Sequence, residues 1–173
     1  PEYWYEGTPI VEIPVIRKSM LDVPSQALAL HQWVTEQPWT QRERVTFAGY
    51  SFGAMFIPAI YHLANSHNKT LNPGVISYAG ADISDLLYTN MDKIDMPWSS
   101  ILEWIGETAI YSIEPDHHLP YMNSEFLIIN GNRDHQISRY SWEKLHRLVP
   151  QPKTVVMIEE GHMHPRYTEL RRK

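Results

Sequence analysis

A serine, an aspartate and a histidine stand in three short segments that could act together as one reactive system. Ser51 lies in the segment GYSFG, Asp134 in GNRDHQI and His162 in EEGHMHP. A serine hydroxyl is a poor nucleophile until a base takes its proton, and a histidine base needs a carboxylate to orient its ring. These residue types, in this order along the chain, predict a nucleophile, an acid and a base.

The segment that holds the serine has the pattern G-x-S-x-G, which describes a tight turn from a strand into a helix. Gly49 and Gly53 would let the backbones of strand and helix pass closely, so that Ser51 is held at a strained, exposed tip. The amide of Phe52 would then lie at the helix N-terminus and point at a developing oxyanion. The pattern also arises by chance, but here an apolar strand directly precedes it and a helical segment follows it.

The elements around these residues alternate between β-branched runs and helical patterns. This alternation is typical of an α/β fold with a mainly parallel sheet flanked by helices. We expect about five strands, at residues 10–16, 45–50, 74–79, 125–130 and 154–159. We expect the main helices at residues 24–36, 52–64 and 139–149. Pro58 lies past the first turn of the expected helix 52–64, so a kink or a local repair is expected there.

The three segments together resemble those of the α/β-hydrolase family, and the resemblance covers about residues 22 to 165. It implies that Ser51 is the nucleophile, Asp134 the acid and His162 the general base. It also implies that Phe52 supplies one oxyanion-hole amide through its backbone. On this scaffold the acid and the base each follow the carboxyl end of a strand, as both do in the predicted element order.

A second histidine, His164, is an alternative base. Members of the family usually place the base directly after a glycine, which favours His162 because it follows Gly161. Two histidines two residues apart in an extended segment also share one face and could ligate a metal. No third ligand is evident in the sequence, so neither a metal nor another cofactor is expected.

The resemblance implies a serine hydrolase that cleaves a carboxylic ester, or a thioester or amide, through an acyl-enzyme on Ser51. Its partner would be a small-molecule ester or acyl substrate. Two alternatives stay open, namely a non-catalytic binding module of the same fold and an acyltransferase that uses the same three residues. Residues 82–122 break the regular alternation and resemble the cap that many members of the family insert.

The chain departs from the family in the segment before the nucleophile. Only 44 residues precede Val45, and they hold one credible strand. No His-Gly pair, which often marks the loop with the second oxyanion donor, occurs before Ser51. We therefore expect one domain over residues 1–173, incomplete at its N-terminus. If the chain folds alone, residues 10–16 should pair with 45–50, and the turn at 17–20 could supply the missing amide.

Length and composition exclude several other classes of protein. The chain has 173 residues, of which 43% are hydrophobic, which suits one domain with a real core. The absence of cysteine excludes disulfide scaffolds and cysteine nucleophiles, and leaves the compartment open. A net charge of −5 argues against nucleic acid and anionic membranes as partners. No apolar run approaches the roughly 18 residues needed to span a membrane, and the oligomeric state is left open.

Overall fold

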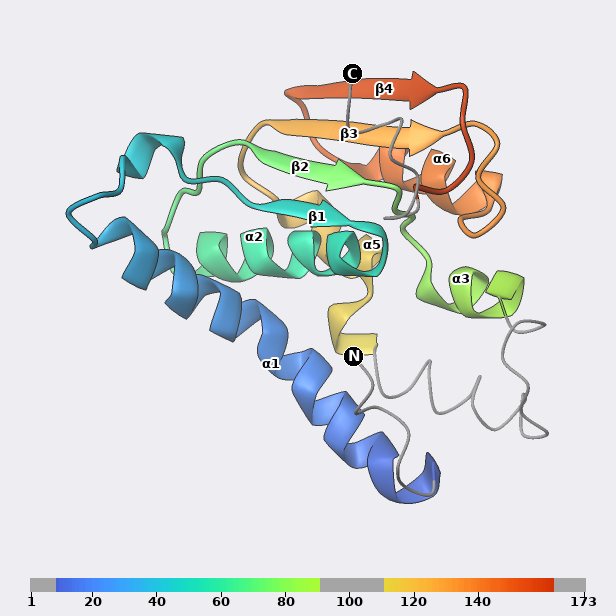
Figure 1. Ribbon diagram of the computed structural model, residues 1–173, viewed down its shortest axis with the longest axis horizontal. Helices are drawn as coiled ribbons and strands as arrows, with labels where there is room; N and C mark the ends of the chain where they lie inside the picture. The colour runs from blue at the N-terminus through green and yellow to red at the C-terminus, as the bar shows by residue number, and fades with distance from the viewer. Residues whose placement is uncertain (1–8, 91–110, 164–173) are drawn as a thin grey trace.

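Four strands lie side by side in the order in which they occur in the chain, and every pair is parallel (Figure 1). This computed structural model describes residues 9–90 and 111–163. The strands are β1 (Ala48–Tyr50), β2 (Gly74–Ser77), β3 (Phe126–Gly131) and β4 (Lys153–Ile158). Because all four strands point the same way, their carboxyl ends meet at one edge of the sheet.

Helical segments connect the strands, which confirms the expected α/β fold with a mainly parallel sheet flanked by helices. The α-helices are α1 (Pro9–Thr35), α2 (Ile57–Ser66), α3 (Ile83–Asn90), α5 (Pro115–His118) and α6 (Arg139–Leu148). The 3-10 helices are η2 (Arg42–Arg44), η3 (Ser51–Phe56), η5 (Tyr111–Ile113) and η6 (Leu119–Tyr121).

The core lies between the sheet and the helices α2 and α6. Phe126 and Asn130 are four residues apart on β3, so both side chains point to the same face. The ring of Tyr61, from α2, lies 4.7 Å from that of Phe126, and His146, from α6, has Nε2 3.0 Å from Oδ1 of Asn130. The two helices therefore cover the same face of the sheet. The largest core side chains with no exposed surface or almost none are Ile76, Leu119, Phe126, Ile128 and Leu145.

The segment after β1 begins as a 3-10 helix and becomes α-helical only at Ile57. This change places Pro58 in the first turn of α2. The first amides of a helix have no partner within it, so the missing proline N–H costs no helical hydrogen bond there. The kink or local repair expected at Pro58 thus takes the form of a 3-10 start, and the α-helix begins at Ile57 instead of residue 52.

The expected strand at residues 10–16 is wrong, because these residues belong to the long helix α1. The apolar stripe of this helix, which includes Met20, Leu21 and Leu28, packs against the core. Extending a helix that is already anchored needs no new nucleus, and each added residue other than proline gains one hydrogen bond. Pro14 and Pro24 lie inside the helix and have no N–H, so neither donates such a bond. Residues 17–20 lie inside the helix as well, so they form no turn beside β1. Within the described residues, β1 pairs only with β2 and leaves its other edge without a strand.

The segment 82–122 lies between β2 and β3 in the chain. It contains α3, η5, α5 and η6, and its residues 91–110 lie outside the described part of the chain. Ile113, Leu119 and Met122 are buried in the common core. Across residues 9–90 and 111–163, no helix combines the length and the apolarity that crossing a membrane requires.

Candidate active site

Ser51 follows the last residue of β1 and adopts the left-handed backbone conformation, with a φ of 50°. A residue other than glycine rarely adopts this conformation, and such strain is concentrated at functional sites. Gly49 makes the tight turn possible, because a Cβ there would lie 2.7 Å from Cγ1 of Ile57. Gly53 has no such role, since a Cβ added there meets nothing within 4 Å. The expectation of two close-contact glycines therefore holds for Gly49 and is wrong for Gly53.

Asp134 lies in the turn that follows β3, and its side chain has no exposed surface. One carboxylate oxygen, Oδ1, accepts hydrogen bonds from the amides of Gln136 (2.8 Å) and Ile137 (3.1 Å). The other oxygen, Oδ2, lies 2.7 Å from Nδ1 of His162. The backbone thus fixes the carboxylate in one orientation, with one oxygen directed at the histidine.

His162 follows β4 and lies between the other two residues. Its Nε2 is 2.8 Å from Oγ of Ser51, and only 9% of its side chain is exposed. An ionised carboxylate can only accept, so Nδ1 of the neutral ring donates to Asp134. This tautomer leaves the lone pair of Nε2 free to accept the hydroxyl proton of Ser51. His164, the alternative base, lies outside the described residues.

The turns that carry the aspartate and the histidine pack directly on each other at Gly131. A Cβ at this position would lie 2.9 Å from the backbone oxygen of Gly161 and would also meet that of Glu160. The amide of Arg133 donates to the carbonyl of Glu160 at 3.1 Å. A glycine at 131 is therefore what lets the two turns approach closely enough for Asp134 to reach His162.

Tyr78 contributes to this site and was not predicted from the sequence. It follows β2, has a φ of 52° and is 3% exposed. Its ring stands edge-on to that of His162, with 5.5 Å between the centroids. Burial raises the pKa of the Tyr78 hydroxyl, and the negative charges of Glu160 and Asp134 raise it further. Tyr78 is thus a neutral phenol whose ring packs against the imidazole of His162. Its place directly after a strand that neighbours the serine is the only sequence signal that could have indicated it.

Phe52 is the second residue of η3, and its side chain is 58% exposed. Amides in the first turn of a helix have no carbonyl partner within that helix. The Phe52 N–H is therefore suitably placed in the chain to donate to a group bound at Ser51. Among the residues that the structure describes, no group of three or more His, Asp or Glu side chains is arranged to hold a metal ion.

Comparisons with solved structures agree on the α/β-hydrolase fold, at sequence identities that show the fold alone. Acetyl xylan esterase 1 from Thermoanaerobacterium sp. JW/SL YS485 matches 83% of this chain with a TM-score of 0.58 and 15% identity. The Pyrococcus furiosus esterase Pf2001 matches 86% with a TM-score of 0.58 and 15% identity. The Pyrococcus horikoshii acylaminoacyl peptidase matches 90% with a TM-score of 0.67 and 12% identity.

This chain is much shorter than these structures. It spans 48% of the acetyl xylan esterase, 56% of the Pyrococcus furiosus esterase and 26% of the acylaminoacyl peptidase. No protein-family model and no curated protein sequence matches the chain.

Proposed function

We propose that the protein is a serine hydrolase that cleaves a carboxylic ester, or a thioester or amide, through an acyl-enzyme on Ser51. The observation that carries this proposal is the pair of hydrogen bonds that joins Ser51 to His162 and His162 to Asp134, at 2.8 and 2.7 Å. The fold supports it as well, because structural neighbours of this chain include esterases and a peptidase.

Each group has a defined role in the proposed reaction. Oγ of Ser51 attacks the acyl carbon while Nε2 of His162 takes its proton, and Asp134 stabilises the imidazolium that forms. The negative oxygen of the tetrahedral intermediate accepts a hydrogen bond from the amide of Phe52. As the intermediate collapses, His162 returns the proton to the departing alcohol. Water then attacks the acyl-enzyme with the same histidine as base, which releases the acid and restores Ser51.

Only one oxyanion donor is assigned to this chain. Removing one of two such donors costs about 10²–10³ in turnover in well-studied enzymes. We therefore expect slow ester turnover alongside normal formation of the Ser51–His162–Asp134 contacts. We also propose that residues 82–122 serve as a cap, in which the acyl specificity would reside.

A fluorophosphonate probe, which reacts with an activated serine, tests the proposal directly. The wild-type chain should be labelled on Ser51, and Ser51→Ala should not be labelled. Ser66→Ala, at the exposed end of α2, is the matched control and should be labelled like the wild type. A wild-type chain that stays unlabelled, under conditions that label a control hydrolase, would instead favour a binding module.

The reaction products separate a hydrolase from an acyltransferase. A panel of p-nitrophenyl esters with increasing acyl length identifies an accepted acyl group. The reaction is then repeated with added alcohols, and the products are analysed. Free acid as the main product supports hydrolysis, whereas a new ester as the main product would identify a transferase.

A further inference from the structure

A cavity of about 420 Å³ lies near the amino ends of the strands, whereas the candidate active site lies at their carboxyl ends. Its walls come from the last two turns of α1, from Arg42 in η2 and from residues 69–71. Arg42 precedes β1 and residues 69–71 precede β2, so they lie near the amino ends of these strands. Ser51, Asp134 and His162 all follow strands and lie at the carboxyl edge. The cavity is therefore a separate site, of the size of ordinary small-molecule pockets.

Hydrogen bonds within the chain connect the segments that form the walls of the cavity. The side-chain amide of Asn72 donates to the carbonyls of Arg42 (2.8 Å) and Val45 (2.7 Å), which ties the segment before β2 to the segment before β1. Nε of Arg42 donates to the carbonyl of Thr35 at 2.7 Å, which ties η2 to the end of α1. The ring of His31 is stacked on Phe47, with 5.4 Å between the centroids. The cavity is thus formed in advance, which lowers the entropic cost of binding.

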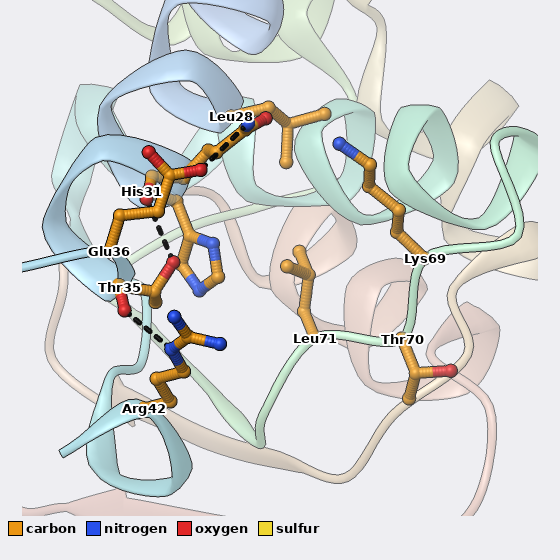
Figure 2. A pocket seen from close by; sticks show the side chains of 9 residues that line it. Leu28, His31, Thr35, Glu36, Arg42, Lys69, Thr70 and Leu71 are labelled. Atoms are coloured by element: carbon orange, nitrogen blue, oxygen red, sulfur yellow. Dashed lines mark hydrogen bonds between the residues drawn. The ribbon is translucent and has the colours of Figure 1, made fainter.

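Within the described part of the chain, the two cations of this cavity, Arg42 and Lys69, have no carboxylate partner. Figure 2 shows Arg42 beside the ring of His31 and Lys69 on the other side of the cavity, with Leu71 between them. No ion pair of either cation occurs within residues 9–90 and 111–163. Because the guanidinium donates to Thr35 through Nε, its two Nη groups are available to a ligand.

The remaining lining residues complete the chemistry of the cavity. Among the described residues that line the cavity, Glu36 is the one carboxylate, and it accepts a hydrogen bond from the side chain of Gln32 at 3.0 Å. Leu28 and Leu71 give the cavity an apolar wall, and Leu71 is 6% exposed. Burial and the charge of Lys69 lower the pKa of His31, so its neutral ring can also hydrogen-bond a ligand at pH 7.

We propose that this cavity binds a small organic dianion, such as a phosphate monoester, whose charge is balanced by Arg42 and Lys69 and whose apolar part lies against Leu28 and Leu71. Arg42 and Lys69 bring two positive charges to the cavity and Glu36 brings one negative charge, so a net attraction for an anion remains, and the arginine fork is a suitable partner for phosphate oxygens. A neutral molecule of the same shape would leave both cations unpaired. This site is independent of the hydrolase proposed above.

Phenyl phosphate is the probe, because it combines a dianion with an apolar ring. The titration uses Ser51→Ala, so that no chemistry at the candidate active site contributes, and follows the imidazole signals of His31 by NMR. His31→Gln assigns these signals. Phenyl phosphate should shift them in a saturable way and raise the pKa of His31, since an anion stabilises the protonated ring. Benzoate, with one charge, should bind more weakly, and benzyl alcohol should cause no shift.

Matched charge variants connect the binding to the two cations. Arg42→Gln and Lys69→Gln should each weaken phenyl phosphate binding about tenfold or more, because each removes a charge-assisted hydrogen bond. Arg147→Gln removes an equal charge from an exposed position on α6 and should leave the binding unchanged. Circular dichroism confirms that each variant is folded. Absent His31 shifts, equal shifts with benzyl alcohol, or equal weakening by Arg147→Gln would each overturn the proposal.

Discussion

Replacing Asp134 by asparagine should abolish most of the hydrolytic activity while keeping the shape of the site. In the wild type, Oδ1 accepts two backbone amides and Oδ2 faces Nδ1 of His162. Backbone amides only donate, so the carbonyl oxygen of the introduced asparagine must occupy the place of Oδ1. Its NH₂ group then faces Nδ1 of His162 and requires that nitrogen to accept. The imidazole proton moves to Nε2, which can no longer accept the proton of Ser51.

The size of the effect follows from this change of tautomer. The same substitution in a Ser-His-Asp protease lowers kcat about 10⁴-fold, and we expect a loss of similar size here. The rates of fluorophosphonate labelling and of p-nitrophenyl ester hydrolysis are measured for Asp134→Asn and for the wild type, and circular dichroism shows whether the variant is folded. Asp22→Asn, in an exposed pair with Lys18 on α1, is the control and should keep full activity. A folded Asp134→Asn variant that loses less than tenfold would refute the assigned tautomer and the role of Asp134.

Three further predictions concern Tyr78, the histidine base and Glu114. Tyr78→Leu should lower kcat about tenfold with KM almost unchanged, because the ring of His162 loses the aromatic ring that packs against it. Tyr78→Phe keeps this ring and should stay near the wild type. Equal losses in both variants would show that the ring of Tyr78 does not position His162. A histidine base accepts the proton of Ser51 only in its neutral form, so kcat/KM for ester hydrolysis should fall as the solution becomes acidic, and a flat profile from pH 5 to 8 would exclude a histidine base. Burial, with Asp116 and Asp82 nearby, raises the pKa of Glu114 to about 7. The folded chain binds this proton more tightly than the unfolded chain, so protonated Glu114 contributes stability that is lost as the pH rises from about 4.5 to 7. The urea concentration at the midpoint of unfolding should therefore fall over this pH range, and Glu114→Gln should make it change less.

The strands that carry the acid and the base could be predicted closely from the sequence. Residues 125–130 and 154–159 were expected, and β3 and β4 cover Phe126–Gly131 and Lys153–Ile158. Both are short β-branched runs that lead into turn residues, so local preference and tertiary structure agree. The same agreement holds for the helix expected at 139–149, where Ser138 caps α6 by accepting from the amide of Ser141.

Local signals failed where the outcome depended on distant contacts. The β-branched residues of 10–16 indicated a strand, yet they extend α1, whose later turns pack on the core. The wall that Tyr78 provides depends on the loop that brings His162 over β2. The cavity with Arg42 and Lys69 depends on the hydrogen bonds that Asn72 makes to the carbonyls of Arg42 and Val45, which lie 30 and 27 residues earlier in the chain. None of these features has a periodicity or a motif that the sequence alone could reveal.

The order of the strands explains why close packing between turns matters so much for this site. The serine follows β1 and the histidine follows β4, and these are the two outermost strands of the described sheet. Neighbouring strands lie about 4.8 Å apart, so the two strand ends are separated by about 14 Å. A 2.8 Å contact between Ser51 and His162 therefore requires the turn after β4 to reach back across the end of the sheet. Gly131 lets this turn pack on the turn that carries Asp134. The ring of Tyr78, which directly follows β2, packs against the imidazole of His162. The candidate active site thus depends on the packing of the turns at least as much as on the three reactive residues.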